Sequence, residues 1–164
     1  MAVTYEVIAT QTLTSPQTNV TFSSISQAYT DMVAVLNLTS VGDNMLGRVG
    51  NGSIDTGNNY SYNRMSGNGS SVSAASGSNY NYLLFDGAAY LNTTPAVYII
   101  QYMNYSNTTT NKAVFARGNN SSVGTDAISL LWRSTAAINT ISFNSASNQY
   151  ATGSTFTLYG IKAA

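Results

Sequence analysis

The chain has 164 residues, with six basic and six acidic side chains, so its formal net charge at pH 7 is zero. It contains no cysteine and no histidine, which excludes disulfides, thiolate or imidazole metal sites, and histidine-dependent catalytic triads. Only 7% of the residues are charged and the basic ones are scattered. We therefore expect no nucleic-acid partner, because phosphate binding requires a clustered basic surface.

Apolar residues recur at every second position, which is the pattern of β-strands. In the segment 31–38, for example, Met32, Ala34 and Leu36 share one face. Clusters of Gly, Asn and Ser, which favour tight turns, separate the strand-like segments. In chain order, we predict strands at 3–14, 18–23, 31–38, 45–50, 60–65, 80–86, 96–105, 112–118, 126–133, 137–143 and 154–162.

Segments 24–29 and 51–79 depart from this strand pattern. The first is the best candidate for a helical turn, and the second, rich in Ser, Gly and Asn, is expected to form long loops with an edge strand. Many short strands with frequent turn signals are typical of a sandwich or barrel. We predict a single domain over residues 1–164, an all-β, jelly-roll-like antiparallel β-sandwich. No segment approaches the roughly 18 apolar residues of a membrane span, so no membrane partner is expected.

The acidic residues do not suggest catalysis. They are spread along the chain, mostly near predicted strand ends and turns, where Asp commonly accepts hydrogen bonds from backbone N–H groups. The loop 55–59 faintly resembles a calcium loop but holds one carboxylate, whereas calcium takes six to eight oxygen ligands. We predict a plain turn at 67–69, no enzymatic activity, no metal and no cofactor. The acids are Glu6, Asp31, Asp43, Asp55, Asp86 and Asp126.

The chain has twelve tyrosines, which suit contact surfaces because each has an apolar ring and a polar tip. Packing between neighbouring strands is the simplest interpretation of the tyrosine clusters. A subunit interface or a platform for stacking sugars are the alternatives. Trp132 lies in the most apolar run and is expected in the core. The possible interface residues are Tyr60, Tyr62, Tyr80, Tyr82, Tyr102 and Tyr105.

Several segments, which together cover nearly the whole chain, resemble a family of small virion structural proteins of tailed bacteriophages, notably cyanophages and marine phages. The most specific of them is Leu-Trp-Arg-Ser-Thr-Ala-Ala-Ile at 131–138. The other segments are 5–10 (Tyr-Glu-Val-Ile-Ala-Thr), 20–25 (Val-Thr-Phe-Ser-Ser-Ile), 29–33 (Tyr-Thr-Asp-Met-Val), 59–62 (Asn-Tyr-Ser-Tyr), 103–109 (Met-Asn-Tyr-Ser-Asn-Thr-Thr) and 153–161 (Gly-Ser-Thr-Phe-Thr-Leu-Tyr-Gly-Ile).

The resemblance implies a capsid decoration (cement) protein or a tail-associated protein, and it carries over no catalytic residue. The expected function is to bind the major capsid protein lattice on the virion surface and stabilise the shell. Near-zero net charge, which gives weak repulsion between copies, favours an assembled state. A homotrimer is expected by analogy with other decoration proteins. The alternative is a tail or fibre head domain that binds host surface glycans.

Overall fold

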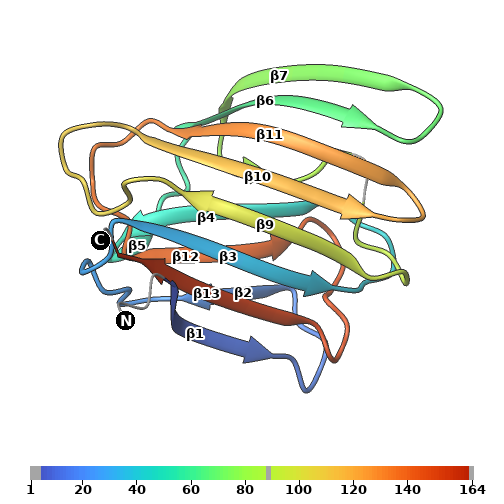
Figure 1. Ribbon diagram of the computed structural model, residues 1–164, viewed down its shortest axis with the longest axis horizontal. Helices are drawn as coiled ribbons and strands as arrows, with labels where there is room; N and C mark the ends of the chain where they lie inside the picture. Colours follow the sequence, from blue (N-terminus) through green and yellow to red (C-terminus); the bar gives the residue numbers. More distant parts are fainter. Residues whose placement is uncertain (1–4, 88–89, 163–164) are drawn as a thin grey trace.

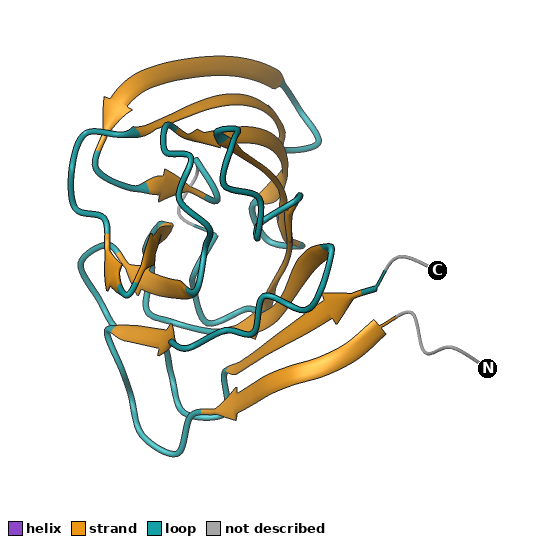
Figure 2. Ribbon diagram, turned by 90° about the vertical axis from the view of Figure 1, so that its left-hand side faces the viewer, coloured by secondary structure: helices purple, strands orange, loops and turns teal. Residues whose placement is uncertain are grey.

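The computed structural model describes residues 5–87 and 90–162. These residues form two antiparallel β-sheets (Figure 1). Figure 2 shows strands and loops but no helix in the described part of the chain. None of the described residues belongs to a helix that is long and apolar enough to cross a membrane. The all-β prediction is confirmed.

The two sheets differ in size. The strand order of the large sheet is β1 (Tyr5–Thr12), β13 (Thr155–Ile161), β3 (Asp31–Leu38), β9 (Ala96–Tyr102), β10 (Lys112–Asn120), β11 (Gly124–Trp132), β6 (Tyr60–Gly67) and β7 (Val72–Tyr80). The order of the small sheet is β2 (Asn19–Phe22), β12 (Thr140–Ser145), β4 (Met45–Asn51) and β5 (Ser53–Ile54), and β8 (Leu83–Leu84) also pairs with β4.

The strand pairing is that of a jelly roll. The first four strands of the chain pair with the later ones in reverse order, β1 with β13, β2 with β12, β3 with β9 and β4 with β8. A long antiparallel ribbon rolled up into two sheets produces this nesting. Two insertions, β5 to β7 and β10 to β11, add strands beside the rolled ribbon. β10, β11, β6 and β7 extend the large sheet beyond β9, as Figure 1 shows.

The core lies between the sheets, because each strand turns alternate side chains inward. In β10, residues alternate strictly between buried and exposed, so Val114 and Ala116 point into the core. Aromatic rings from both sheets meet there: the ring centroids of Phe143 in β12 and Phe156 in β13 are 5.9 Å apart. Trp132 is buried, as predicted. The rolled ribbon therefore encloses one apolar core.

The predicted strands agree with most of the observed ones, and the departures have physical causes. Segment 24–29 forms no helical turn. The backbone there takes a positive φ of 54° at Ser24, which a right-handed helix cannot contain. Segment 51–79 is not mainly loop, since β5, β6 and most of β7 fall within it. The long strand β7 has no apolar alternation of its own and is ordered by pairing with β6.

Candidate docking face on the large sheet

Three of the six tyrosines predicted at an interface lie in the core instead. Tyr60, Tyr102 and Tyr105 are at most 1% exposed. The Tyr60 hydroxyl donates to the backbone oxygens of Val49 and Asp55, and the Tyr105 hydroxyl donates to a backbone oxygen in the 24–29 loop. The prediction is wrong for these three residues because their rings face the small sheet or the loops that close the core, not solvent.

The other three predicted tyrosines pack against one another at partly exposed positions. The ring centroids of Tyr62 and Tyr80 are 5.4 Å apart, and those of Tyr80 and Tyr82 are 5.2 Å apart. Close packing at Gly77 supports the cluster, because a Cβ there would lie 2.5 Å from the Tyr80 ring. Tyr62 pairs in register with Leu130, which faces the core. The cluster is therefore on the inner side of the sheet, and its place in an interface stays a prediction.

The carboxylates of Asp43 and Asp55 organise loops, as the sequence predicts. Asp43 accepts hydrogen bonds from the N–H groups of Ser147 and Asn148 and from the Ser145 hydroxyl. Burial opposes ionisation of Asp43, but these hydrogen bonds hold its pKa below the ordinary value. Among the described residues, no cluster of three or more acidic side chains could hold a metal ion.

The Asp55 carboxylate is likewise occupied by protein donors. It accepts hydrogen bonds from the Gly57 N–H, the Asn59 amide and the Trp132 indole, the last at 2.7 Å. These bonds keep the pKa of Asp55 below its ordinary value although burial raises it. The loop 55–59 therefore uses its single carboxylate to fix itself to Trp132, and offers a cation few free oxygens.

Asp86 and Asp126 form a buried acidic pair. Both side chains are at most 2% exposed. Asp86 accepts hydrogen bonds from the Tyr98 hydroxyl at 2.6 Å and from the Met45 N–H, and Asp126 accepts from the Gly87 N–H and the Tyr90 hydroxyl. Burial raises the pKa of Asp86 to about 7, and the neighbouring Asp126 adds to the shift. These hydrogen bonds connect Asp86 to β4 and β9, and they connect Asp126 to Gly87 and Tyr90. Neither carboxylate is exposed to solvent.

Apolar side chains are exposed on the outer face of the large sheet. One row crosses five strands in register, from Val35 in β3 through Ile99, Arg117 and Ala127 to Met65 in β6. Met65 is 66% exposed, and Ile99 is 40% exposed. Single exposed apolar residues are ordinary, but a contiguous group on one face is typical of an interaction site.

A second row lies beside the first, shifted by two residues along each strand. It runs from Val33 through Gln101, Phe115 and Ser129 to Asn63. Phe115 is 47% exposed. We call the outward side chains of these two rows the docking face, without Val33, which is only 5% exposed. Arg117 is the one charged residue among the remaining nine.

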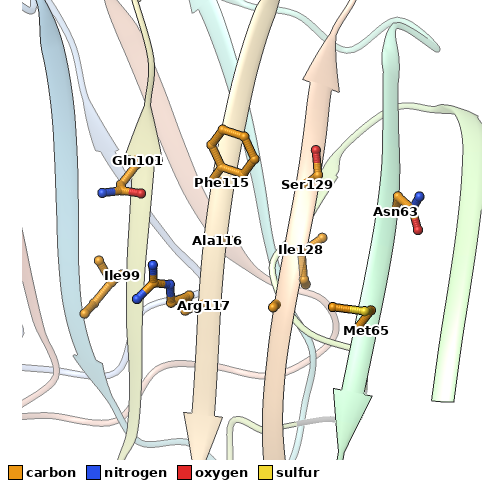
Figure 3. A pocket seen from close by; sticks show the side chains of 10 residues that line it. Asn63, Met65, Ile99, Gln101, Phe115, Ala116, Arg117, Ile128 and Ser129 are labelled. Carbon is orange, nitrogen blue, oxygen red and sulfur yellow. The ribbon is translucent and has the colours of Figure 1, made fainter. Parts of the chain in front are cut away.

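The docking face is slightly hollowed where the two rows meet. A shallow depression of about 460 Å³ lies over β9, β10, β11 and β6. Figure 3 shows the side chains around it, with Ile99 on β9, Phe115 and Arg117 on β10, and Met65 on β6. A shallow, open and nearly neutral surface suits contact with another protein surface better than enclosure of a small molecule.

The docking face was not predicted from the sequence, although the strands carry a signal for it. β9 carries apolar residues on both faces, with Tyr98 and Ile100 inward and Val97 and Ile99 outward. In β10, Phe115 points outward between the buried residues Val114 and Ala116. A strand that is apolar on both faces is typical of a sheet covered on both sides. The small sheet covers one side, and the outer side is left exposed.

A scan against protein-family models finds no match to this chain, and a search of the curated proteins finds none either. A function is therefore proposed from the site and from the sequence resemblance.

Proposed function

We propose that this protein is a non-enzymatic structural protein of a bacteriophage particle, which binds the major capsid protein lattice through the docking face and stabilises the shell. The observation that carries the proposal is the exposed apolar surface with a single charge, Arg117, on the outer face of the large sheet. The assignment to a phage particle and its capsid is based on the sequence resemblance. By spanning neighbouring capsid subunits, such a decoration protein adds contacts that must break before the shell opens.

The composition of the docking face supports protein binding. Interface cores are depleted of charged residues and enriched in aromatic residues, Met and Arg. Phe115, Met65 and Arg117 supply these types within the depression. The sheet also presents them without a large loss of conformational entropy, since strand backbone is already ordered. We expect Phe115 and Arg117, an aromatic ring and a guanidinium on one strand, to contribute most to binding.

The acidic residues support a non-enzymatic function. Glycoside hydrolysis requires two carboxyl groups that face a substrate across a cleft. Asp86 and Asp126 are near each other, but their side chains are buried and hydrogen-bonded to the fold. Asp43 and Asp55 are held by loop donors, and Glu6 pairs with Lys162 at 2.8 Å.

Glycan binding by a tail or fibre head domain is the second candidate function. The observation that favours it is the partly exposed cluster of Tyr62, Tyr80 and Tyr82, because sugars stack on aromatic rings. Jelly rolls occur in both viral capsid and lectin domains, so the fold does not separate the two functions. The residues involved do separate them, since the tyrosine cluster and the docking face lie on opposite sides of β6.

The test is binding to emptied capsids that lack this protein, measured by co-sedimentation. We expect the parent protein to bind, and the double variant Ile99→Glu with Phe115→Glu to lose at least about tenfold in affinity, equivalent to 1.4 kcal/mol. Both side chains are exposed, so the variant should keep the parent's melting temperature. The nearby Arg117 can pair with the new carboxylates.

The matched control places the same two charges outside the docking face, as Val41→Glu with Thr93→Glu in exposed loops. This control should bind capsids as the parent does. The proposal would be overturned if the parent protein did not bind the emptied capsids. If it instead binds host cells, and Tyr82→Ala abolishes that binding, the glycan-binding function is supported.

A further inference from the structure

The four edges of the two sheets are not equally open to further strands. Exposed edges can pair with another chain, and proteins commonly block this with short strands, bulges or charges. In the small sheet, the edge strands β2, β5 and β8 have only four, two and two residues. In the large sheet, the edge strand β1 contains a bulge between Val7 and Ala9 and a charged pair, Glu6 with Lys162.

The fourth edge, β7, is neither short nor charged, and its one bulge lies near its end, between Gly77 and Tyr80. It runs for nine residues, Val72–Tyr80, with no charged residue and no proline. Its pairing with β6 is regular from Val72 to Gly77, and a bulge comes only beyond that stretch. No other described strand pairs with the second edge of β7, and Figure 1 shows β7 at the margin of the sheet. Backbone hydrogen-bonding groups on that edge therefore face outward.

The side chains of β7 fit a second copy of the same strand. Val72, Ala74 and Ser76 lie on the outer face, in register with Gly67, Met65 and Asn63 of β6. If two β7 strands pair antiparallel around a two-fold axis at Ala75, Ala74 of one copy lies opposite Ser76 of the other, so that small neutral side chains oppose one another across the junction. Such a pairing brings no like charges together, and a two-fold interface uses the same surface on both partners.

We propose that two copies of this protein associate through antiparallel pairing of their β7 strands, so that the two large sheets form one continuous sheet. A two-fold axis perpendicular to the sheet keeps the outer faces on the same side. The dimer thus presents two docking faces in one surface. Val72, which is 89% exposed in the single chain, lies beside this junction and becomes partly covered.

This assembly differs from the homotrimer expected by analogy, since self-pairing of one strand edge closes at two copies. It also adds to the proposed function without depending on it, because dimerisation is measured in the absence of capsids. A dimer with two docking faces on the same side would bind a repeating lattice more tightly than a single copy, because the second contact forms within the bound complex.

The test uses charge on the outer face of β7. We expect the parent to show twice the 17.3 kDa chain mass by light scattering. The double variants Ala74→Lys with Ser76→Lys, and Ala74→Glu with Ser76→Glu, should each be monomeric at the same concentration, since like charges opposed across paired strands are destabilising. Mixing the lysine variant with the glutamate variant should restore the dimer, because opposite charges then face each other.

The matched control puts two lysines on the other edge of the large sheet, as Thr10→Lys with Thr12→Lys on the exposed surface of β1. This variant should remain dimeric. A parent mass of one or three chains would overturn the inference, as would β7 variants that stay dimeric or a control that dissociates. Circular dichroism of each variant confirms that the fold is retained.

Discussion

At the scale of single residues, burial changes the chemistry of Asp86. The carboxyl group of Asp86 is fully buried, and this desolvation, together with Asp126, raises its pKa to about 7, above the ordinary value of 3.8. The hydrogen bonds from Tyr98 and Met45 only partly oppose the shift. The folded state therefore holds a proton between about pH 4 and pH 7 that the unfolded chain releases.

The sign of the resulting pH dependence follows from that difference. The contribution of Asp86 is fully present below the unfolded pKa of 3.8 and is lost as pH rises through 7. We expect the free energy of unfolding to fall by about 4 kcal/mol between pH 4 and pH 8, since each pKa unit corresponds to about 1.4 kcal/mol. The chain has no histidine, so no imidazole titrates in the same window.

The variant Asp86→Asn tests this expectation. Its amide oxygen can still accept from Tyr98 and Met45, but it does not ionise. Urea denaturation at several pH values should show a flatter profile for the variant and greater stability than the parent at pH 8. Parallel profiles for the two proteins would show that Asp86 does not titrate in this range.

At the scale of elements, close contact between β4 and the ring of Phe85 fixes how the strand packs. Gly47 lies on the inner face of β4, and a Cβ built there would be 2.3 Å from Cε2 of Phe85. That ring also contacts Phe143 of β12, at a centroid distance of 6.2 Å, so it has little room to move. The glycine is thus required by packing and not by an unusual φ.

We expect Gly47→Ala to destabilise the protein by about 1–3 kcal/mol, the usual cost of overpacking a core. The matched control is Gly67→Ala in β6, where the nearest atom to a new Cβ is a Val72 methyl carbon at 4.0 Å. That change should alter stability by no more than about 0.5 kcal/mol. Equal denaturation midpoints for the two variants would contradict this packing argument.

At the scale of the whole molecule, an apolar core and internal hydrogen bonds hold the two sheets together. The core combines rings and aliphatic chains from both sheets, such as Tyr98, Ile141 and Phe156. The carboxylates of Asp43 and Asp55 are hydrogen-bonded to protein donors. These two carboxylates are therefore held in place by protein donors, without a bound cation.

We therefore expect EDTA to leave the melting temperature unchanged within about 2 °C, a shift that corresponds to less than about 1 kcal/mol in a domain of this size. Differential scanning calorimetry with and without the chelator measures this. A larger drop that added calcium reverses would show that an ion is bound and stabilises the fold.

The sequence by itself determined most of the local structure of this protein. Alternation of apolar residues predicted most of the strands, because a strand's side chains alternate between two faces whatever its neighbours are. The same pattern placed Trp132 in the core, and the turn preference of Asp placed Asp43 and Asp55 in loops, where their carboxylates accept backbone hydrogen bonds. The number of short strands and the turn signals between them predicted a sandwich or barrel, and the nested strand pairing in the structure identifies the jelly roll.

Only the tertiary structure decided which faces are covered. Tyr60 and Tyr62 share a strand face, yet Tyr60 is fully buried and Tyr62 is partly exposed, because coverage depends on the other sheet and the loops. Likewise β7, built of small residues, becomes a strand through its pairing with β6. The docking face is exposed because the small sheet covers only the inner face of the large sheet, and the edge of β7 is open because no described strand pairs with it. Contacts between segments that are distant in the sequence decide both.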